Sequence, residues 1–381
     1  MLKPLSQVQM DTITLWYLVQ HSLSSFYKLE QHFGTAHHAV QPHNLQDWSK
    51  LGLHKNHIQR AQHFYTAPEQ NKFQHLLQEI EKHSDFVLSY HDPEYPQQLL
   101  PYSDKPPILF GQGRRSLLMQ PQIAIVGSRK PSPHGRQIAY DFSYYLSEKG
   151  FVISSGLAQG IDEAAHQGAL SHQRTLAVMG TGLDQTYPSQ HQQLRQQILQ
   201  QSGTIISEFL PHTPPLQHHF PRRNRIVSAL SLGVIVAEAS LKSGSIITAK
   251  LAAEQGKLVF AIPGHIYSEF HQGCHQLIRE GAILVDHPEQ VLEDLALPTQ
   301  WQAQQQSQSD LTTQQVLAKT EIPEHLMSLY NQLNWTGYPL DHLAIHLEQD
   351  TATLTAQLME LELLGLCMQQ SGVYLRCRPS Q

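Results

Sequence analysis

Apolar residues before residue 85 recur at helical spacing. Leu15, Leu18 and Val19 fall on one face of a helix, and Gly34 and Gly52 mark turns between such segments. This spacing predicts short amphipathic helices. Residues 1–85 are therefore predicted to form a small helical domain of the SAM or helix-hairpin-helix kind. Its helix–turn–helix units could contact a nucleic-acid backbone, or the domain could serve only for packing and protein interaction.

Between residues 86 and 297 the apolar residues instead form short continuous runs that alternate with helical patterns. The predicted strands are 123–126, 151–153, 175–179, 204–207, 234–237 and 258–261. The predicted helices are 135–149, 161–170, 226–232 and 248–255. Continuous apolar runs are typical of strands buried on both faces. Their alternation with helices predicts an α/β fold with an extended Rossmann-like parallel sheet. The proline-rich stretch 91–113 is predicted to be an extended connector.

The C-terminal part has a different composition. Residues 298–320 are rich in Gln and Ser and predict a flexible linker. Residues 321–381 read as three helices followed by two short strands, the pattern of a winged helix. Its predicted recognition helix, 351–364, carries Glu360 and Glu362 and no Lys or Arg. Because such a helix repels phosphates, we expect this domain to contact protein or the α/β core rather than DNA.

Charge and cysteine usage narrow the class of protein. The net charge is −6, and residues 296–381 hold 3 Lys or Arg against 8 Asp or Glu, so the rest of the chain is nearly balanced. No apolar run reaches the ~18 residues of a membrane helix, and the first residues lack the features of a secretory leader. The three cysteines show no metal-ligand spacing. We therefore expect a cytoplasmic protein with neither a bound metal nor a membrane span.

Small, hydroxyl-bearing and basic residues gather where the predicted strands end. Ligands of open parallel sheets bind at this edge. Glycines there let the backbone approach a phosphate, and helix N-termini supply oriented N–H groups. The candidate binding residues are Gly127, Ser128, Arg129, Ser155, Gly156, Gly160, Arg222, Arg223, Asn224, Arg225, Lys242, Ser243, Gly244 and Ser245.

Each of these groups also has a purely structural interpretation. The glycines could allow close approach of a ligand or of a neighbouring loop. Asp162 could cap its helix or orient Arg129, and Glu238 is expected to receive an arginine. The arginines at 222–225 precede the predicted helix 226–232, where cations oppose the helix dipole. Stability alone would not favour that placement, whereas a bound anion would relieve it.

The number of phosphate-friendly loops exceeds what one mononucleotide needs, so an extended polyanion fits better. Arg129 interrupts any GxGxxG pattern and no Walker sequence occurs, which argues against a dinucleotide cofactor and against an ATP-driven motor. We expect no cofactor. Two alternatives stay open. One is a phosphoribohydrolase-like enzyme with Glu238 or Asp162 as the acid, and the other is a scaffold whose basic loops bind an acidic protein.

Six ordered segments of the chain resemble the DNA-processing protein DprA (Smf) family. They are IAIVGSRKPSPHGR, ISSGLAQGIDEAAHQGAL, TLAVMGTGLDQTYP, FPRRNRIVSALS, KSGSIITAKLAAEQGKLVFAIPG and GCHQLIREGAILV. The resemblance implies a non-catalytic, single-stranded-DNA-binding protein of natural transformation. Such a protein protects incoming DNA, helps to load the RecA recombinase, and forms a homodimer through the Rossmann-like domain.

The resemblance also implies roles for individual residues. The DNA pocket would be lined by Gly127, Ser128 and Arg129 and shaped by Gly156 and Gly160. Further phosphate contacts would come from Arg222, Arg223 and Arg225, and Lys242 with Ser245 would close the pocket. Lys242 stands where the family usually has an arginine, which keeps the charge but loses the bidentate fork.

Overall fold

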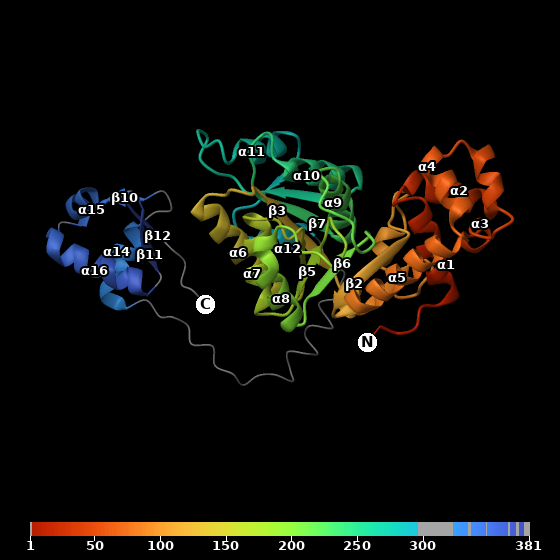
Figure 1. Cartoon of the computed structure of the whole chain (residues 1–381). Coiled ribbons are helices and arrows are strands. Elements are labelled where there is room, and N and C mark those ends of the chain that lie inside the picture. The colour runs from red at the N-terminus through yellow and green to blue at the C-terminus, as the bar shows by residue number, and fades with distance from the viewer. Residues whose placement is uncertain are drawn as a thin grey trace. The chain divides into compact units, whose positions relative to one another are not determined.

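The computed structural model describes residues 2–295, 323–333, 337–347, 349–364, 366–370 and 373–376. The chain divides into two compact units, residues 1–297 and 298–381 (Figure 1). The predicted linker, 298–320, lies outside the described residues. None of the described helices is long and apolar enough to cross a membrane.

The first unit begins with five helices. They are α1 (Gln7–Leu18), α2 (Leu23–Phe33), α3 (Ala36–Ala39), α4 (Lys55–His63) and α5 (Ala67–His83), with the 3-10 helix η1 (Leu45–Leu51) between α3 and α4. The predicted turn glycines, Gly34 and Gly52, have positive φ angles of 82° and 62°, which suits glycine at the end of a helix. The helices pack on the sheet: Trp16 Nε1 donates to Glu208 O at 2.8 Å, and the core around Trp16 continues to Ile205.

A nine-stranded sheet forms the centre of the first unit. Its strands are β1 (Phe86–Ser89), β2 (Ile108–Gly113), β3 (Gln122–Gly127), β4 (Val152–Ser155), β5 (Thr175–Val178), β6 (Thr204–Ser207), β7 (Gly233–Glu238), β8 (Leu258–Ala261) and β9 (Ile283–Leu284). Their order is β1-β2-β6-β5-β4-β3-β7-β8-β9. The seven strands β3 to β9 run parallel to one another, which confirms the predicted Rossmann-like sheet.

Two strands at one edge differ from the prediction. Strand β2 pairs antiparallel with β6, and β1 pairs antiparallel with β2. The end of the predicted extended connector, residues 108–113, is therefore a strand of the sheet. The apolar run 108–110 is short, directly follows Pro107 and is followed by Gly-Gln-Gly, and proline and glycine are depleted in strands.

Seven helices cover the two faces of the sheet (Figure 1). They are α6 (Pro133–Glu148), α7 (Ile161–Leu170), α8 (Gln192–Gln200), α9 (His219–Leu230), α10 (Gly244–Glu254), α11 (Gln272–Arg279) and α12 (Pro288–Asp294). Neighbouring residues of β3 separate the faces: Ile125 packs in the core of α6, α7 and α12, whereas Val126 packs in the core of α9, α10 and α11. This alternation follows from the two-residue period of a strand.

The order in which strands are added to the sheet reverses at β3. Strands β4, β5 and β6 follow one another on one side of β3, and β7, β8 and β9 follow on the other. The loops after β3 and β7 therefore leave for opposite faces, α6 on one and α10 on the other. Such a switch point leaves a crevice at the carboxyl ends of the strands, where ligands of this fold class bind.

The second unit has its own core. Its elements are η5 (Glu324–Leu326), α14 (Met327–Gln332), β10 (Tyr338–Pro339), α15 (Leu340–Leu347), α16 (Thr351–Leu363), β11 (Cys367–Gln370) and β12 (Val373–Arg376). Three antiparallel strands in the order β10-β12-β11 flank the helices. Leu329, Leu343 and Leu358 are among the buried residues. The order of helices and strands is that of the predicted winged helix.

Candidate nucleic-acid interface

The loop after β3 is fixed to both of its neighbours at the switch point. The Ser128 backbone N–H donates to Glu238 O at 2.7 Å, and Ser128 O accepts from the Ile161 N–H at 3.1 Å. The Ser128 hydroxyl accepts from the Lys130 N–H at 3.1 Å. Since backbone bonds hold it to the ends of both β7 and the loop before α7, this loop presents its next side chain from a rigid base.

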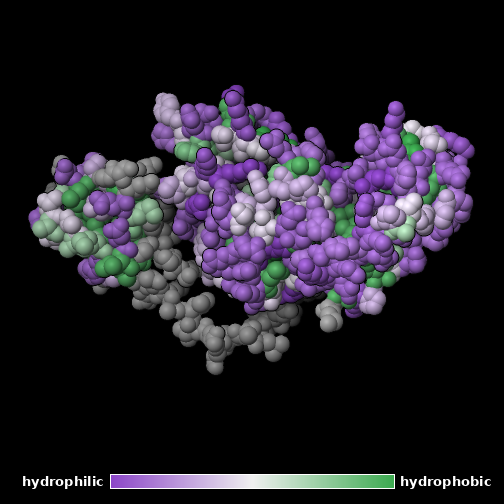
Figure 2. Space-filling view, viewed as in Figure 1, coloured by the Kyte–Doolittle hydropathy of each residue, from purple (hydrophilic) through white to green (hydrophobic). Residues whose placement is uncertain are grey.

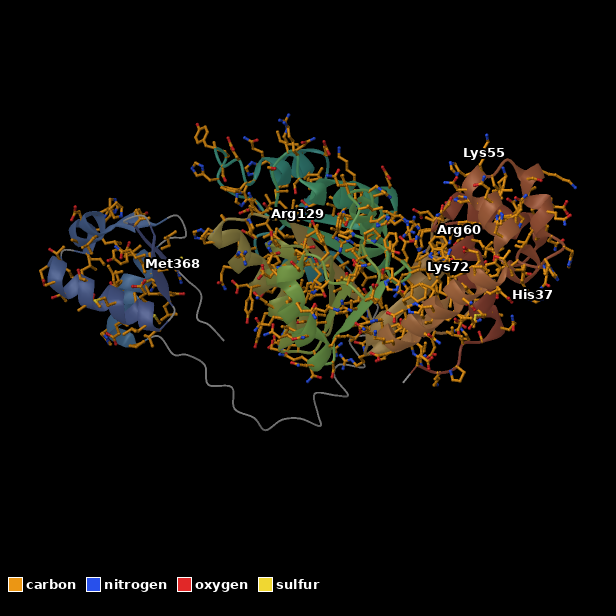
Figure 3. The ribbon with its side chains drawn as sticks, in the orientation of Figure 1. His37, Lys55, Arg60, Lys72, Arg129 and Met368 are labelled. Atoms are coloured by element: carbon orange, nitrogen blue, oxygen red, sulfur yellow. The ribbon has the colours of Figure 1, made fainter. Side chains whose placement is uncertain are left out.

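That side chain is Arg129, which is exposed at the rim of the sheet (Figure 3). Its guanidinium carbon lies 5.7 Å from the centroid of the Phe220 ring, and the Tyr187 ring lies 5.1 Å from that of Phe220. Tyr187 is 41 % exposed. Among the described residues Arg129 has no carboxylate within ion-pairing distance. Three segments thus bring one unneutralised cation and two aromatic faces together.

The glycines of the loop before α7 serve contacts between loops. A Cβ at Gly156 would collide with the guanidinium of Arg223, and one at Gly160, whose φ is 87°, would collide with Ser128 O. Ser155 is buried, and its hydroxyl donates to Ile125 O at 2.7 Å. Of the two interpretations that the sequence left open for these glycines, close approach of a neighbouring chain segment accounts for both.

Arg223 lies inside the molecule. It is buried and donates to Val178 O and, through Nε at 3.1 Å, to Asn224 Oδ1. Burial lowers the pKa of Arg223 to about 10, and the nearby Asp162 opposes that shift. Asp162 is itself buried and accepts from the Gly156 N–H at 3.0 Å and the Ala158 N–H at 3.3 Å. Asp162 therefore neither caps its helix nor orients Arg129.

Arg222 and Arg225 converge on one buried carboxylate, that of Glu208. Arg222 donates through Nε and Nη2 at 3.0 and 2.9 Å, and Arg225 Nη2 donates at 2.7 Å. Glu208 is fully buried. Burial alone would raise the pKa of Glu208, but Arg225 and Arg222 outweigh it and hold the pKa below its ordinary value. Arg222 Nη1 also donates to His21 O at 2.6 Å, so the pair ties α9 to the N-terminal helices.

These contacts correct the expectation that Arg222, Arg223 and Arg225 line an open phosphate trough. Helix α9 begins at His219, seven residues before the predicted start, so the arginines lie inside the helix and not ahead of its N-terminus. Pro221 is tolerated there because the first turn of a helix needs no N–H partner at that position. The dipole conflict that favoured a bound anion at this run is therefore absent.

The carboxylate of Glu238 also differs from its expected role. It accepts from the Ser132 N–H at 3.0 Å and from the Ser132 hydroxyl at 2.6 Å, and Ser132 is the N-cap of α6. No described arginine pairs with it. Burial raises the pKa of Glu238 despite these bonds. The carboxylate fixes the start of α6, and a Cβ at Gly135 would strike it.

The start of α10 forms the other side of the crevice. The Ser243 hydroxyl caps the helix and lies 2.7 Å from the Ser245 hydroxyl. Lys242 is exposed, and a Cβ at Gly244 would meet nothing within 4 Å. Packing therefore does not require Gly244, in contrast to Gly156 and Gly160. Lys242 places a positive charge on this exposed surface, and Leu241 and Ile247, which flank residues 242–245, are exposed as well.

The groups along this edge of the sheet suit the binding of a nucleic acid. They combine a guanidinium, an ammonium, hydroxyls and the N-terminus of α10, which suit phosphates, with two rings that suit bases. No cluster of His, Cys, Asp or Glu among the described residues could hold a metal ion. Phe220 and Tyr187 are absent from the predicted set, because the sequence shows only that they lie near the loops and not that they meet.

Comparisons with known proteins point in one direction. The family described as DNA recombination-mediator protein A matches residues 86–296, and the DprA winged helix domain matches residues 323–373. The chain is 38 % identical to protein Smf of Escherichia coli over 84 % of this chain and 85 % of that protein. It is 45 % identical to DNA processing protein DprA of Streptococcus pneumoniae over 58 % of this chain and 77 % of that protein.

Two solved structures are similar to this one. The X-ray structure of DprA from Streptococcus pneumoniae has a TM-score of 0.66 and 36 % identity, covering 75 % of this chain and 98 % of that chain. The DprA structure from Helicobacter pylori has a TM-score of 0.51 and 32 % identity, covering 55 % and 95 %. The latter is described as giving insight into a single-stranded DNA binding mode.

Proposed function

Because the chain belongs to the DprA (Smf) family of DNA-processing proteins, we propose that it binds single-stranded DNA along the rim of its sheet during natural transformation. The observation that carries the proposal is the group formed by Arg129, Phe220 and Tyr187. A cation beside the exposed Tyr187 ring and the half-buried Phe220 ring can hold a backbone phosphate while unpaired bases stack on the aromatic faces. The Helicobacter pylori relative with a described single-stranded DNA binding mode supports this choice of ligand.

The same geometry favours binding of a single strand over binding of a duplex. Rings can stack only on bases that are free of a partner strand. Lys242 and the open backbone at Gly244 extend the surface beyond Arg129 across the switch point. We therefore propose a trough of Gly127, Ser128, Arg129, Phe220 and Tyr187 on one side and residues 242–245 on the other. The buried arginines of α9 support the trough from beneath.

We propose further that the protein does not transform the DNA. The alternative, a phosphoribohydrolase-like enzyme, needs a carboxylic acid that reaches its substrate. Asp162 is buried against backbone amides, and Glu238 is held by Ser132. Neither carboxylate is poised toward an open site, which argues against that enzyme; we propose instead that the protein protects DNA and helps to load the RecA recombinase. Cys274 is a buried, free thiol, which is compatible with the proposed cytoplasmic location.

Homodimerisation through the Rossmann-like domain is part of the same proposal. Large apolar side chains are exposed on the loop after β8 and at the start of α10: Leu241, Ile247, Ile266, Tyr267 and Phe270. The two segments are joined where the Gly273 N–H donates to Ala239 O at 2.8 Å. Exposed apolar patches of this kind commonly mark protein interfaces. Sedimentation velocity of the Tyr267→Glu variant tests the dimer, which we expect to dissociate.

Fluorescence anisotropy with single- and double-stranded oligonucleotides tests the proposed function. We expect the single strand to bind at least about tenfold more tightly, with an affinity that falls with log salt at about −0.7Z for Z of about 4–6. The Arg129→Ala variant should lose about tenfold or more in affinity. Lys55→Ala removes one charge from the distant α4 and serves as the control (Figure 3). Equal losses in both variants, or equal affinity for duplex, would contradict the proposal.

A further inference from the structure

Helix α16 of the winged-helix unit has apolar residues on two opposite faces. The inner face buries Leu354, Leu358 and Leu361 in the core of the unit. A second set of apolar residues is exposed, and we call it the outer stripe: Ala352, Ala356, Met359 and Leu363. Met359 is 59 % exposed and Leu363 is 89 % exposed. A helix that needed only to complete its own core would carry polar residues on this side.

The outer stripe has the spacing of a helix-packing seam. Its members are separated by four, three and four positions, which is the a/d pattern of a coiled coil. At about 100° per residue the four side chains fall within an arc of roughly 60°, opposite the buried leucines. The two alanines at the N-terminal end allow a neighbouring helix to come close, and Met359 and Leu363 project as knobs at the other end. Figure 2 shows hydrophobic residues on the visible face of this unit.

The charge around the stripe is negative. Glu360 and Glu362 flank its C-terminal half on either side, and Asp350 caps the helix at its start. Residues 296–381 carry 3 Lys or Arg against 8 Asp or Glu. His325 Nε2 lies 3.0 Å from Glu360 Oε2, and Glu362, which is exposed, accepts a hydrogen bond from the Gln369 N–H at 3.3 Å through one of its two carboxylate oxygens.

We infer that the outer stripe of α16 docks a basic amphipathic helix of a partner protein. The partner's apolar ridge covers the stripe, and its Lys or Arg side chains pair with Glu360 and Glu362. A nucleic acid is disfavoured because the helix carries no cation and its carboxylates repel phosphates. A second copy of this unit is disfavoured because it would bring two acidic surfaces together. Charge complementarity therefore selects a basic partner.

The full-length chain and two synthetic peptides test this inference. Both peptides repeat leucines at a and d positions; one carries lysine and the other glutamate at the flanking positions. We expect the lysine peptide to bind at least tenfold more tightly than the glutamate peptide, and more weakly as salt is raised. The double variant Met359→Ser with Leu363→Ser should lower its affinity about tenfold. Met119→Ser, which also removes an exposed methionine but from the first unit, should leave it unchanged.

Charge reversal gives a second, independent readout. In the variant with Glu360→Lys and Glu362→Lys, the preference should turn toward the glutamate peptide, while single-stranded DNA affinity of the first unit's rim stays within about twofold. Thermal unfolding of each variant verifies that the unit is folded. Equal binding of the two peptides, or lysine-peptide binding that survives the serine variants, overturns the inference. Self-association that the serine variants abolish would identify a second copy as the occupant and overturn it too.

Discussion

Two sets of arginines near the same sheet edge have opposite surroundings. Arg129 stands exposed at the end of β3, next to an aromatic ring and without a carboxylate among the described residues. Arg222 and Arg225 lie in α9 and direct their donors to the buried Glu208. The isolated cation is therefore available to a ligand, and the dense run is committed to the fold. Local charge density along a sequence says little about which charge solvent or DNA can reach.

The difference follows from what each guanidinium would lose. An exposed arginine keeps its hydration and gains from a passing phosphate. A buried arginine has given up that hydration, and only its carboxylate partner offsets the cost. Removing a member of the buried group should thus damage the structure, while removing Arg129 should damage only binding.

The largest effect is expected from Arg225→Met. It leaves Glu208 buried with one fewer partner, which should reduce the free energy of unfolding by about 3–5 kcal/mol. Urea unfolding measures the loss, and Arg279→Met, at an exposed position of α11, serves as the control. If Arg225→Met instead left stability intact and abolished DNA binding, Arg225 would be a DNA contact and not a structural residue.

Acidification should lower the stability of the first unit, which holds the arginines of α9, without any substitution. Burial lowers the pKa of His21, beside Arg222, and of the fully buried His166 from 6.5 to about 3. Because these folded-state pKa values lie below those of the unfolded chain, the stability they contribute is present above about pH 6.5 and is lost as pH falls toward 3. For His166 alone the loss between pH 7 and pH 5 is about 2 kcal/mol.

Urea unfolding at pH 7 and pH 5 measures this loss. Residues 323–376 should lose less, because their described histidines are exposed: His325, His342 and His346. A first unit that gains stability on acidification would show that these histidines are protonated in the folded state.

A smaller effect is expected at the rim from Phe220→Leu. Loss of one stacking face should weaken binding of a single-stranded oligonucleotide by about 1–2 kcal/mol, with the affinity for duplex barely changed. Anisotropy titrations measure both. Tyr140→Leu, on the exposed side of α6, removes a ring elsewhere and should change neither. Equal weakening for single strand and duplex would mean that Phe220 only positions Arg129.

The smallest effect is expected from Lys242→Gln. If Lys242 contacts one phosphate, the slope of log affinity against log salt should fall in magnitude by about 0.7, with the fold unaffected. Lys55→Gln, on α4, should leave the slope unchanged. A slope that is the same for both variants would restrict the interface to the side of the crevice that holds Arg129.

The strands of the core could be predicted because each is a continuous apolar run, as in β3 and β7. Strand β2 could not, since its apolar run, 108–110, lies in a proline-rich stretch directly after Pro107 and is followed by Gly-Gln-Gly. The start of α9 was missed because its first turns, 219–225, are polar and include a proline. In these cases tertiary contacts decide the structure, and local propensity does not reveal them.

Within the candidate site, the outcome depended on partners far away in the sequence. Ser128 and Arg129 were identified from a turn that follows a strand, a purely local signal. The half-buried Arg222 and the buried Arg225 depend on Glu208, which directly follows β6 and approaches them only when the sheet has formed. The meeting of Phe220 with Tyr187 likewise joins the first turn of α9 to the loop after β5.

The bond from Trp16 to the carbonyl of Glu208 has a consequence for how this chain can be dissected. The indole anchors the amino-terminal helices to the residue whose carboxylate holds the α9 arginines. Removal of residues 1–85 would therefore expose the side of the sheet on which Ile205 lies. It would also remove a contact that helps to hold Glu208 and, with it, the α9 arginines in place. A shortened version would be expected to melt early and aggregate, and its weakened hold on DNA would say nothing about whether those helices touch the nucleic acid.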